Sequence, residues 1–291
     1  MIRRGTGLWF ATPALAVIAV FFFLPVAGAL VLGFTDFDIY AIADLRNVRF
    51  VGLRNFQELL ATPLFWRALG NTLYFAVVGV PLSMAASVGA ALLLNSPLAR
   101  LKSFYRTVLF APVVTTLVAV ALIWRYLLHT RYGLLNYGLG LAGISPIDWL
   151  GNPTTALPAI ILFSVWKNFG YNMVIVLVAL QQIPEDLYEA ASLDGASAWQ
   201  QFRHVTLPSL RPTLAFVGIL TLAAYFQLFA EPYVMTQGGP AQSTLSILYF
   251  MYDEGFKWWN LGRASAVAFV LFLMMFAVTG FNAWLAQRRA A

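Results

Sequence analysis

The sequence predicts an all-α integral membrane protein, a bundle of six transmembrane helices, and three observations lead to this expectation. First, 60% of the 291 residues are hydrophobic and only 10% are charged, whereas soluble domains are about 45–50% apolar and about 25% charged. Second, the chain contains several long runs without charge, and about 20 apolar residues are enough to cross a bilayer core. Third, the charged residues gather in the segments that connect these runs.

Six stretches that are uncharged or nearly so predict the six spans. The first stretch is longer than the 7–15-residue apolar core of a cleavable signal peptide, so a retained span is expected there. A seventh apolar stretch, Leu245–Met251, is too short to cross. We expect a single transmembrane domain over residues 1–291, with spans at about 8–34, 69–94, 107–127, 156–180, 212–230 and 264–287.

The distribution of basic residues predicts the orientation. An even number of spans places both termini on one side of the membrane. The short second connection carries Arg100, Lys102 and Arg106 and no acidic residue, and short basic loops stay in the cytoplasm. Both termini, and the connection over 181–211, are therefore expected to be cytoplasmic. The net charge of +6 does not indicate nucleic-acid binding, because no basic cluster exceeds a pair.

The connection between the fourth and fifth spans is unusually polar. Glu185 and Asp186 follow a proline and suit the first turn of a helix, where acidic side chains complement the helix dipole. Gly195 is expected to end that helix, since glycine adopts positive φ without steric cost. Ser197 and Gln200 form a capping-box pattern for a second helix. These signals predict a helix–glycine–helix hairpin along the membrane surface.

The spacing within this hairpin resembles the signature loop of ABC-importer permeases. Glu189-Ala190-Ala191 is followed after three residues by Gly195, and after nine more by Val205-x-Leu207-Pro208. The segment "YVMTQGGPAQSTLSILYFMYDEGF" narrows the resemblance to carbohydrate-uptake permeases, specifically the maltose-type first permease, with similar lactose and glycerol-phosphate permeases. The resemblance implies a loop that docks in a cleft of an ATP-binding subunit. The implied docking residues are Glu189, Ala190, Ala191, Asp194, Gly195, Leu207 and Pro208.

The resemblance also implies the partners. It describes a permease in the bacterial cytoplasmic membrane that forms the pathway for a sugar together with a second, homologous permease, two copies of the ATP-binding subunit and an extracytoplasmic sugar-binding protein. ATP and magnesium are expected in the ATP-binding subunits. This chain lacks a G-x-x-x-x-G-K-[ST] phosphate loop and is not expected to be an enzyme or to bind a cofactor. His129 and His204 stand alone, so no metal site is expected.

Two polar stripes within spans are candidates for the substrate pathway. Polar residues inside membranes usually face the bundle interior, and residues three or four apart share a helix face. The resemblance aligns both stripes with sugar-contacting positions, although such residues also bond packed helices to one another. Lys167 could contact an anionic substrate or pair with a carboxylate of a partner subunit. The candidates are Ser164, Lys167, Asn168 and Tyr171 in the fourth span, and Thr221 and Tyr225 in the fifth.

Three other functions would make different demands on the sequence. A permease for glycerol-3-phosphate or another polyol phosphate would share the docking loop and give Lys167 a substrate role. An ion-coupled secondary transporter would need paired intramembrane acids, and the six spans contain no Asp or Glu. A membrane-bound enzyme would need a catalytic constellation, and none is apparent in the sequence.

Overall fold

The computed structural model describes residues 4–96 and 98–290, and within this part of the chain the regular structure is helical. One isolated antiparallel β-bridge joins Thr35 to Phe50. The all-α expectation is confirmed. The chain divides into two compact units, and each is described by itself: Met1–Trp66 with Phe250–Met274, and Arg67–Tyr249 with Met275–Ala291.

Five helical stretches among the described residues are long and apolar enough to cross a membrane, and a sixth crossing is obtained if one bent helix pair counts as a span. The pair consists of α6 (Lys102–Val114) and α7 (Leu117–Leu127), whose axes differ by 100°. The sequence predicted one continuous span over 107–127. Thr115 and Thr116 have extended backbones between the two helices. The Thr115 hydroxyl donates to the Pro112 carbonyl, a local bond that competes with helix continuation.

The first unit begins with a long apolar helix whose described side chains are largely uncovered. α1 (Arg4–Ile18), a π-helical turn and α2 (Leu24–Leu32) follow one another, and none of the spanning stretch Phe10–Leu32 is buried. A helix that is apolar all round and uncovered needs lipid or another subunit around it. Two short helices come next, α3 (Ile39–Ala43) and α4 (Arg54–Ala61).

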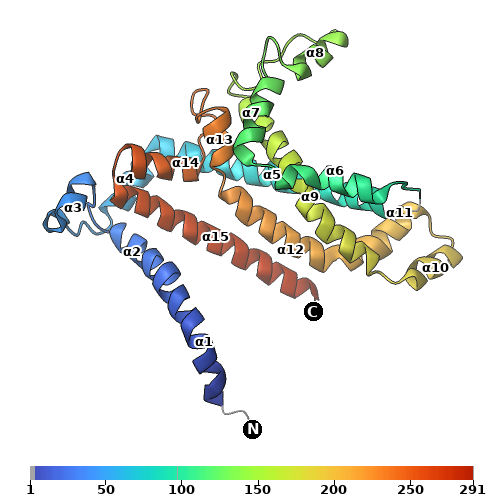
Figure 1. Cartoon of the computed structure of the whole chain (residues 1–291), viewed down its shortest axis with the longest axis horizontal. Coiled ribbons are helices and arrows are strands. Elements are labelled where there is room, and N and C mark those ends of the chain that lie inside the picture. The colour runs from blue at the N-terminus through green and yellow to red at the C-terminus, as the bar shows by residue number, and fades with distance from the viewer. Residues whose placement is uncertain (1–3, 97, 291) are drawn as a thin grey trace. The chain divides into compact units, whose positions relative to one another are not determined.

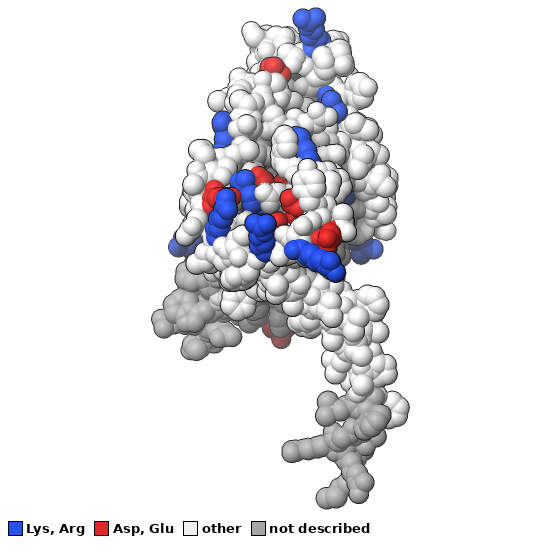
Figure 2. Space-filling model, turned by 90° about the vertical axis from the view of Figure 1, so that its left-hand side faces the viewer, with Lys and Arg blue, Asp and Glu red and all other residues white. Residues whose placement is uncertain are grey.

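Polar contacts join α4 and its C-cap to two neighbouring segments, the chain that follows α2 and the start of α15 (Leu261–Ala290). The buried Asn55 amide donates to the carbonyls of Gly33, at 2.9 Å, and Thr35, at 2.7 Å. Arg263 donates to the Thr62 hydroxyl at 3.2 Å and lies 3.6 Å from the Glu254 carboxylate. Figure 2 shows basic and acidic side chains close together near the middle of this face, with further basic side chains scattered above them.

The second unit is built around α9 (Ala156–Gln181), which is the most buried of the five long apolar stretches. α9 contacts α6, α12 and α13, and near its C-terminal end it joins α5 and α12 in an apolar cluster that includes Met173 and Leu210. The other helices are α5 (Pro63–Asn95), α8 (Leu134–Leu141), α10 (Glu185–Leu193), α11 (Ala198–Gln201), α12 (Leu207–Phe226), α13 (Ala230–Met235) and α14 (Ile247–Tyr252).

A glycine sets the closest approach between α9 and α6. A Cβ atom at Gly170 would lie 2.3 Å from the Leu109 carbonyl oxygen and 3.2 Å from backbone atoms of Leu109 and Phe110. These neighbours are backbone and cannot turn away, so only glycine permits this crossing. The crossing brings the middle of α9 next to α6, the first helix of the bent pair.

Gly170→Ala is therefore expected to destabilise the protein, by about 1–3 kcal/mol as for other overpacked sites. The matched control is Gly89→Ala in α5, where an added Cβ meets nothing within 4 Å and the better helix propensity of alanine is neutral or stabilising. Thermal unfolding of the two detergent-solubilised variants measures the difference. Equal melting temperatures would show that α6 and α9 do not meet at Gly170.

Candidate functional site

The connection between α9 and α12 has the helix–glycine–helix form that the sequence predicted. α10 begins at Glu185, with Pro184 as its N-cap and Glu185 and Asp186 in its first turn. Gly195 has φ +77° and follows the end of α10. The capping box of α11 is complete: the Ser197 amide donates to Gln200 Oε1 at 2.7 Å, and the Gln200 amide donates to Ser197 Oγ at 3.4 Å. We call residues 184–208 the docking loop.

Hydrogen bonds between the two halves hold the docking loop in one shape. Gln201 Nε2 donates to Ser192 Oγ at 3.0 Å, and the hydroxyls of Tyr188 and Thr206 are 2.9 Å apart. Figure 1 shows α10 and α11 at the end of α9 and α12, away from α13. The loop therefore stands as a preformed knob on the two helices that it connects.

The outer surface of the docking loop is open and partly apolar. Of the seven predicted docking residues, four are exposed and three, Ala191, Leu207 and Pro208, are partly buried. Sequence reasoning missed two exposed members, Leu193 at 90% and Trp199 at 66% exposure. Burying one leucine contributes about 1.5–3 kcal/mol, and tryptophan is enriched among interface hot spots. The loop thus offers acidic and apolar side chains together, as a protein-binding surface does.

The six candidate pathway residues differ in their surroundings. Ser164, Lys167, Thr221 and Tyr225 are buried, whereas Tyr171 is 51% exposed. The Asn168 amide donates to the Ser164 carbonyl within α9, so this pair makes no link between helices. The fourth-span stripe therefore runs from the interior of the unit to its surface.

The polar link between α9 and α12 is made by a residue that the sequence reasoning did not select. Asn172 Nδ2 donates to Thr221 Oγ1 at 2.8 Å, and both side chains are buried. Thr221 in turn donates to the Val217 carbonyl. This contact is of the kind that joins packed membrane helices. Asn172 lies next to Tyr171 in sequence, and its position in an apolar run was the one signal that could have identified it.

Four buried hydroxyls make no hydrogen bond of good geometry among the described residues: those of Ser83, Ser164, Tyr225 and Ser243. The hydroxyls of Ser83 and Tyr225 lie beside each other. The Tyr225 ring is fixed by packing, since its centroid lies 4.9 Å from that of Phe75 and a Cβ at Gly79 would approach it to 2.6 Å. Buried polar atoms are normally paired. Unpaired hydroxyls in the interior are groups that a polyhydroxylated ligand can satisfy.

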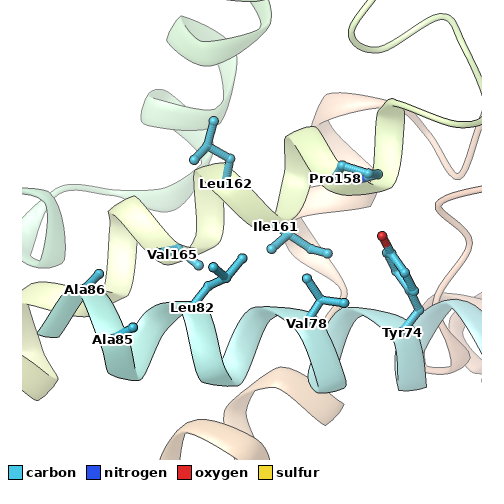
Figure 3. Close-up of a pocket in the computed structure, with 9 residues that line it drawn as sticks. All are labelled: Tyr74, Val78, Leu82, Ala85, Ala86, Pro158, Ile161, Leu162 and Val165. Atoms are coloured by element: carbon cyan, nitrogen blue, oxygen red, sulfur yellow. The ribbon is translucent and has the colours of Figure 1, made fainter. Parts of the chain in front are cut away.

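A separate cavity opens between α5 and α9, with a volume of about 470 Å³. Figure 3 shows that its lining is apolar apart from the Tyr74 hydroxyl. None of the six candidate pathway residues lines it. A sugar would lose its hydrogen bonds to water there without replacement, so this cavity is not suited to a sugar. Its lining residues are Tyr74, Val78, Leu82, Ala85, Ala86, Pro158, Ile161, Leu162 and Val165.

Comparison with known families decides the class of protein. Residues 1–291 match the family described as binding-protein-dependent transport system inner membrane component. The chain belongs to this family. It is a multi-pass membrane component of a binding-protein-dependent transporter, and the resemblance to ABC-importer permeases is confirmed.

Two of the similar relatives are named as permeases for sugars. The chain is 36% identical over 287 residues to the lactose transport system permease protein LacF of Rhizobium radiobacter, covering 97% of this chain and 94% of that one. It is 35% identical over 270 residues to the trehalose/maltose transport system permease protein MalF of Thermococcus litoralis, covering 92% and 88%.

Solved structures share the fold. A chain of a bacterial ABC transporter involved in the import of the acidic polysaccharide alginate superposes with a TM-score of 0.82 at 22% identity, covering 99% of this chain and 97% of that one. The same type of transporter in complex with an alginate pentasaccharide-bound periplasmic protein gives a TM-score of 0.80 at 21% identity, covering 99% and 96%.

Proposed function

We propose that this chain forms, together with a second homologous permease, the pathway by which an ATP-driven importer moves a sugar across the bacterial cytoplasmic membrane. The single observation that carries the proposal is the docking loop. It is a preformed, solvent-exposed helix–Gly195–helix hairpin between α9 and α12, and it has the signature spacing of ABC-importer permeases. The names of the lactose and trehalose/maltose relatives support the sugar class.

The remaining subunits follow from this role. Two ATP-binding subunits receive the docking loops of the two permeases, and they hold ATP and magnesium. An extracytoplasmic binding protein delivers the sugar to the opposite side. When ATP binding brings the two ATP-binding subunits together, the docking loop moves with them. Because the loop connects α9 and α12, these two helices move as well. The pathway then alternates between outward and inward access.

A sugar is favoured over a polyol phosphate by the state of Lys167. Its ammonium already donates to the Val113 carbonyl, at 3.1 Å, and is 6% exposed. A phosphate would need a free cation in the pathway. The candidate pathway residues other than Lys167 are neutral and suit hydroxyl groups.

Uptake of radiolabelled sugars tests the function. Cells lacking this chain are expected to lose uptake of one mono-, di- or oligosaccharide, and the restored gene is expected to return it. Labelled glycerol-3-phosphate is the parallel substrate. Loss of glycerol-3-phosphate uptake with all sugars unaffected would contradict the sugar assignment and favour the polyol-phosphate permease.

Cysteine labelling tests the orientation, in which both termini and the docking loop are cytoplasmic. The chain has no cysteine, so Ala198→Cys in α11 and Ala142→Cys after α8 each give a single exposed thiol. In intact spheroplasts, a membrane-impermeant maleimide is expected to label position 142 and to label position 198 only after lysis. Labelling of position 198 before lysis, with position 142 protected, would reverse the topology.

A further inference from the structure

The bend between α6 and α7 leaves backbone carbonyls without helical partners. The last four carbonyls of a helix have no intrahelical donor, and in a membrane each must be satisfied by another group. Two of those at the end of α6 are satisfied from outside the backbone. Thr115 Oγ1 donates to the Pro112 carbonyl at 2.6 Å, and Lys167 Nζ donates to the Val113 carbonyl at 3.1 Å.

Lys167 reaches this position because α9 and α6 cross closely. Gly170 lies one helical turn further along α9, where it permits contact with the Leu109 backbone. The Lys167 side chain is consequently buried against the end of α6. A cation at a helix C-terminus is stabilised by the helix dipole, so the bend provides both a hydrogen-bond acceptor and a favourable potential for the ammonium.

A carboxylate on a third element shares this environment. Glu231 lies in the first turn of α13, which contacts both α7 and α9. Desolvation raises the pKa of Glu231, and the charge of Lys167 opposes that rise. No described carboxylate lies within 4.0 Å of the Lys167 ammonium, so the interaction of Glu231 with Lys167 acts over a longer distance than an ion pair. Arg125 in α7 donates to the Val234 carbonyl of α13 at 3.3 Å.

We propose that Lys167 is a positioning residue: its ammonium closes the end of α6 at Val113 and holds the third span bent, with Glu231 balancing the charge. This internal role is an alternative to the contact with an anionic substrate, or with a partner's carboxylate, that the sequence suggested for Lys167. α9 leads through Pro184 into the docking loop, so a movement of the loop reaches the bend through Lys167. Only this last step rests on the proposed function.

Distance measurements by pulsed electron paramagnetic resonance report the bend directly. Phe104→Cys in α6 and Ile123→Cys in α7 replace exposed side chains, at 60% and 56% exposure, and each carries a nitroxide. At 1.5 Å per residue, a continuous helix would separate the two Cα atoms by about 28 Å. The bend of 100° shortens this separation to about 19 Å.

The assembled spin-labelled transporter in lipid nanodiscs is expected to show the short distance. Two variants of it are expected to show the same distance: Lys167→Arg, because it keeps a cationic donor, and Glu231→Gln, because it keeps the bond from Lys167 to the Val113 carbonyl. Lys167→Met is expected to move the distribution toward the long distance and to lower sugar uptake at least tenfold. If Lys167→Met is not recovered because Glu231 is left unbalanced, the double variant Lys167→Met with Glu231→Gln removes both charges and is expected to show the long distance.

The short distance in Lys167→Met, or in the double variant, would overturn the proposal. If uptake is nevertheless lost in that case, Lys167 acts on the substrate instead. The distances do not depend on which solute is carried, so a failure of the sugar assignment would appear as absent uptake in the parent chain with the bend unchanged.

Discussion

Gly195→Asp is expected to abolish sugar uptake while leaving the permease folded. Gly195 has φ +77°, and a Cβ added there meets nothing within 4 Å. The cost within this chain is therefore the left-handed backbone alone, about 1–2 kcal/mol for an L-residue and less for Asp, which tolerates this region. In the docked state the carboxylate would be desolvated inside the cleft of the ATP-binding subunit, beside Glu189 and Asp194. Burying an unpaired charge is far more costly.

A second glycine provides the matched control. Gly143 has the same φ of +77° and equally open space around its Cβ position, but it follows α8 in another connection. Gly143→Asp is expected to retain uptake and to co-purify with the ATP-binding subunit in the parental ratio, whereas Gly195→Asp loses the subunit. Equal co-purification and equal uptake of the two variants would show that the docking loop is not where the ATP-binding subunit attaches.

Tyr225→Phe is expected to raise the KM for sugar uptake about three- to tenfold without lowering thermal stability. The change removes one oxygen from a side chain that is 3% exposed and that packs on Phe75. That oxygen makes no hydrogen bond of good geometry among the described residues, although the Ser83 side chain lies beside it, so the fold loses at most one weak hydrogen bond. A bond to the sugar is worth about 0.5–1.5 kcal/mol, and 1.4 kcal/mol corresponds to a factor of ten.

Thr221→Val is the counterpart in the same helix. It removes the hydroxyl that accepts from Asn172 at 2.8 Å, and a buried amide left unpaired costs about 1–3 kcal/mol. The melting temperature of Thr221→Val is therefore expected to fall, whereas the melting temperature of Tyr225→Phe is expected to stay close to that of the parent protein. An unchanged KM in Tyr225→Phe would mean that its hydroxyl does not touch the substrate, and the fifth-span stripe would then serve helix packing alone.

The features that the sequence predicted correctly are those fixed by local rules. The uncharged runs indicated where long helices lie, and Gly195, Ser197 and Gln200 predicted the end of one short helix and the start of the next. Glycine and capping residues act within a few positions of themselves. Their effect therefore does not depend on what the rest of the chain does.

The features that were missed depend on partners distant in sequence. The break at Thr115 and Thr116 lies in an apolar run, so hydropathy predicted one continuous span. Lys167 bonds to a backbone carbonyl, and a carbonyl leaves no trace in the sequence. Asn172 was passed over because its neighbours Asn168 and Tyr171 completed a stripe, yet Asn172 is the residue that reaches Thr221. Helical spacing gives the face of each helix but does not say which neighbour that face meets.

ATP hydrolysis in proteoliposomes tests the central claim most directly. The vesicles would contain this permease, its partner permease and the ATP-binding subunit, with the sugar-binding protein added on the side opposite the docking loop. The account predicts that the sugar-loaded binding protein raises the hydrolysis rate severalfold and that labelled sugar appears across the membrane, with neither effect in the Gly195→Asp transporter. Hydrolysis that is indifferent to the loaded binding protein, or stimulated equally in Gly195→Asp, would contradict it.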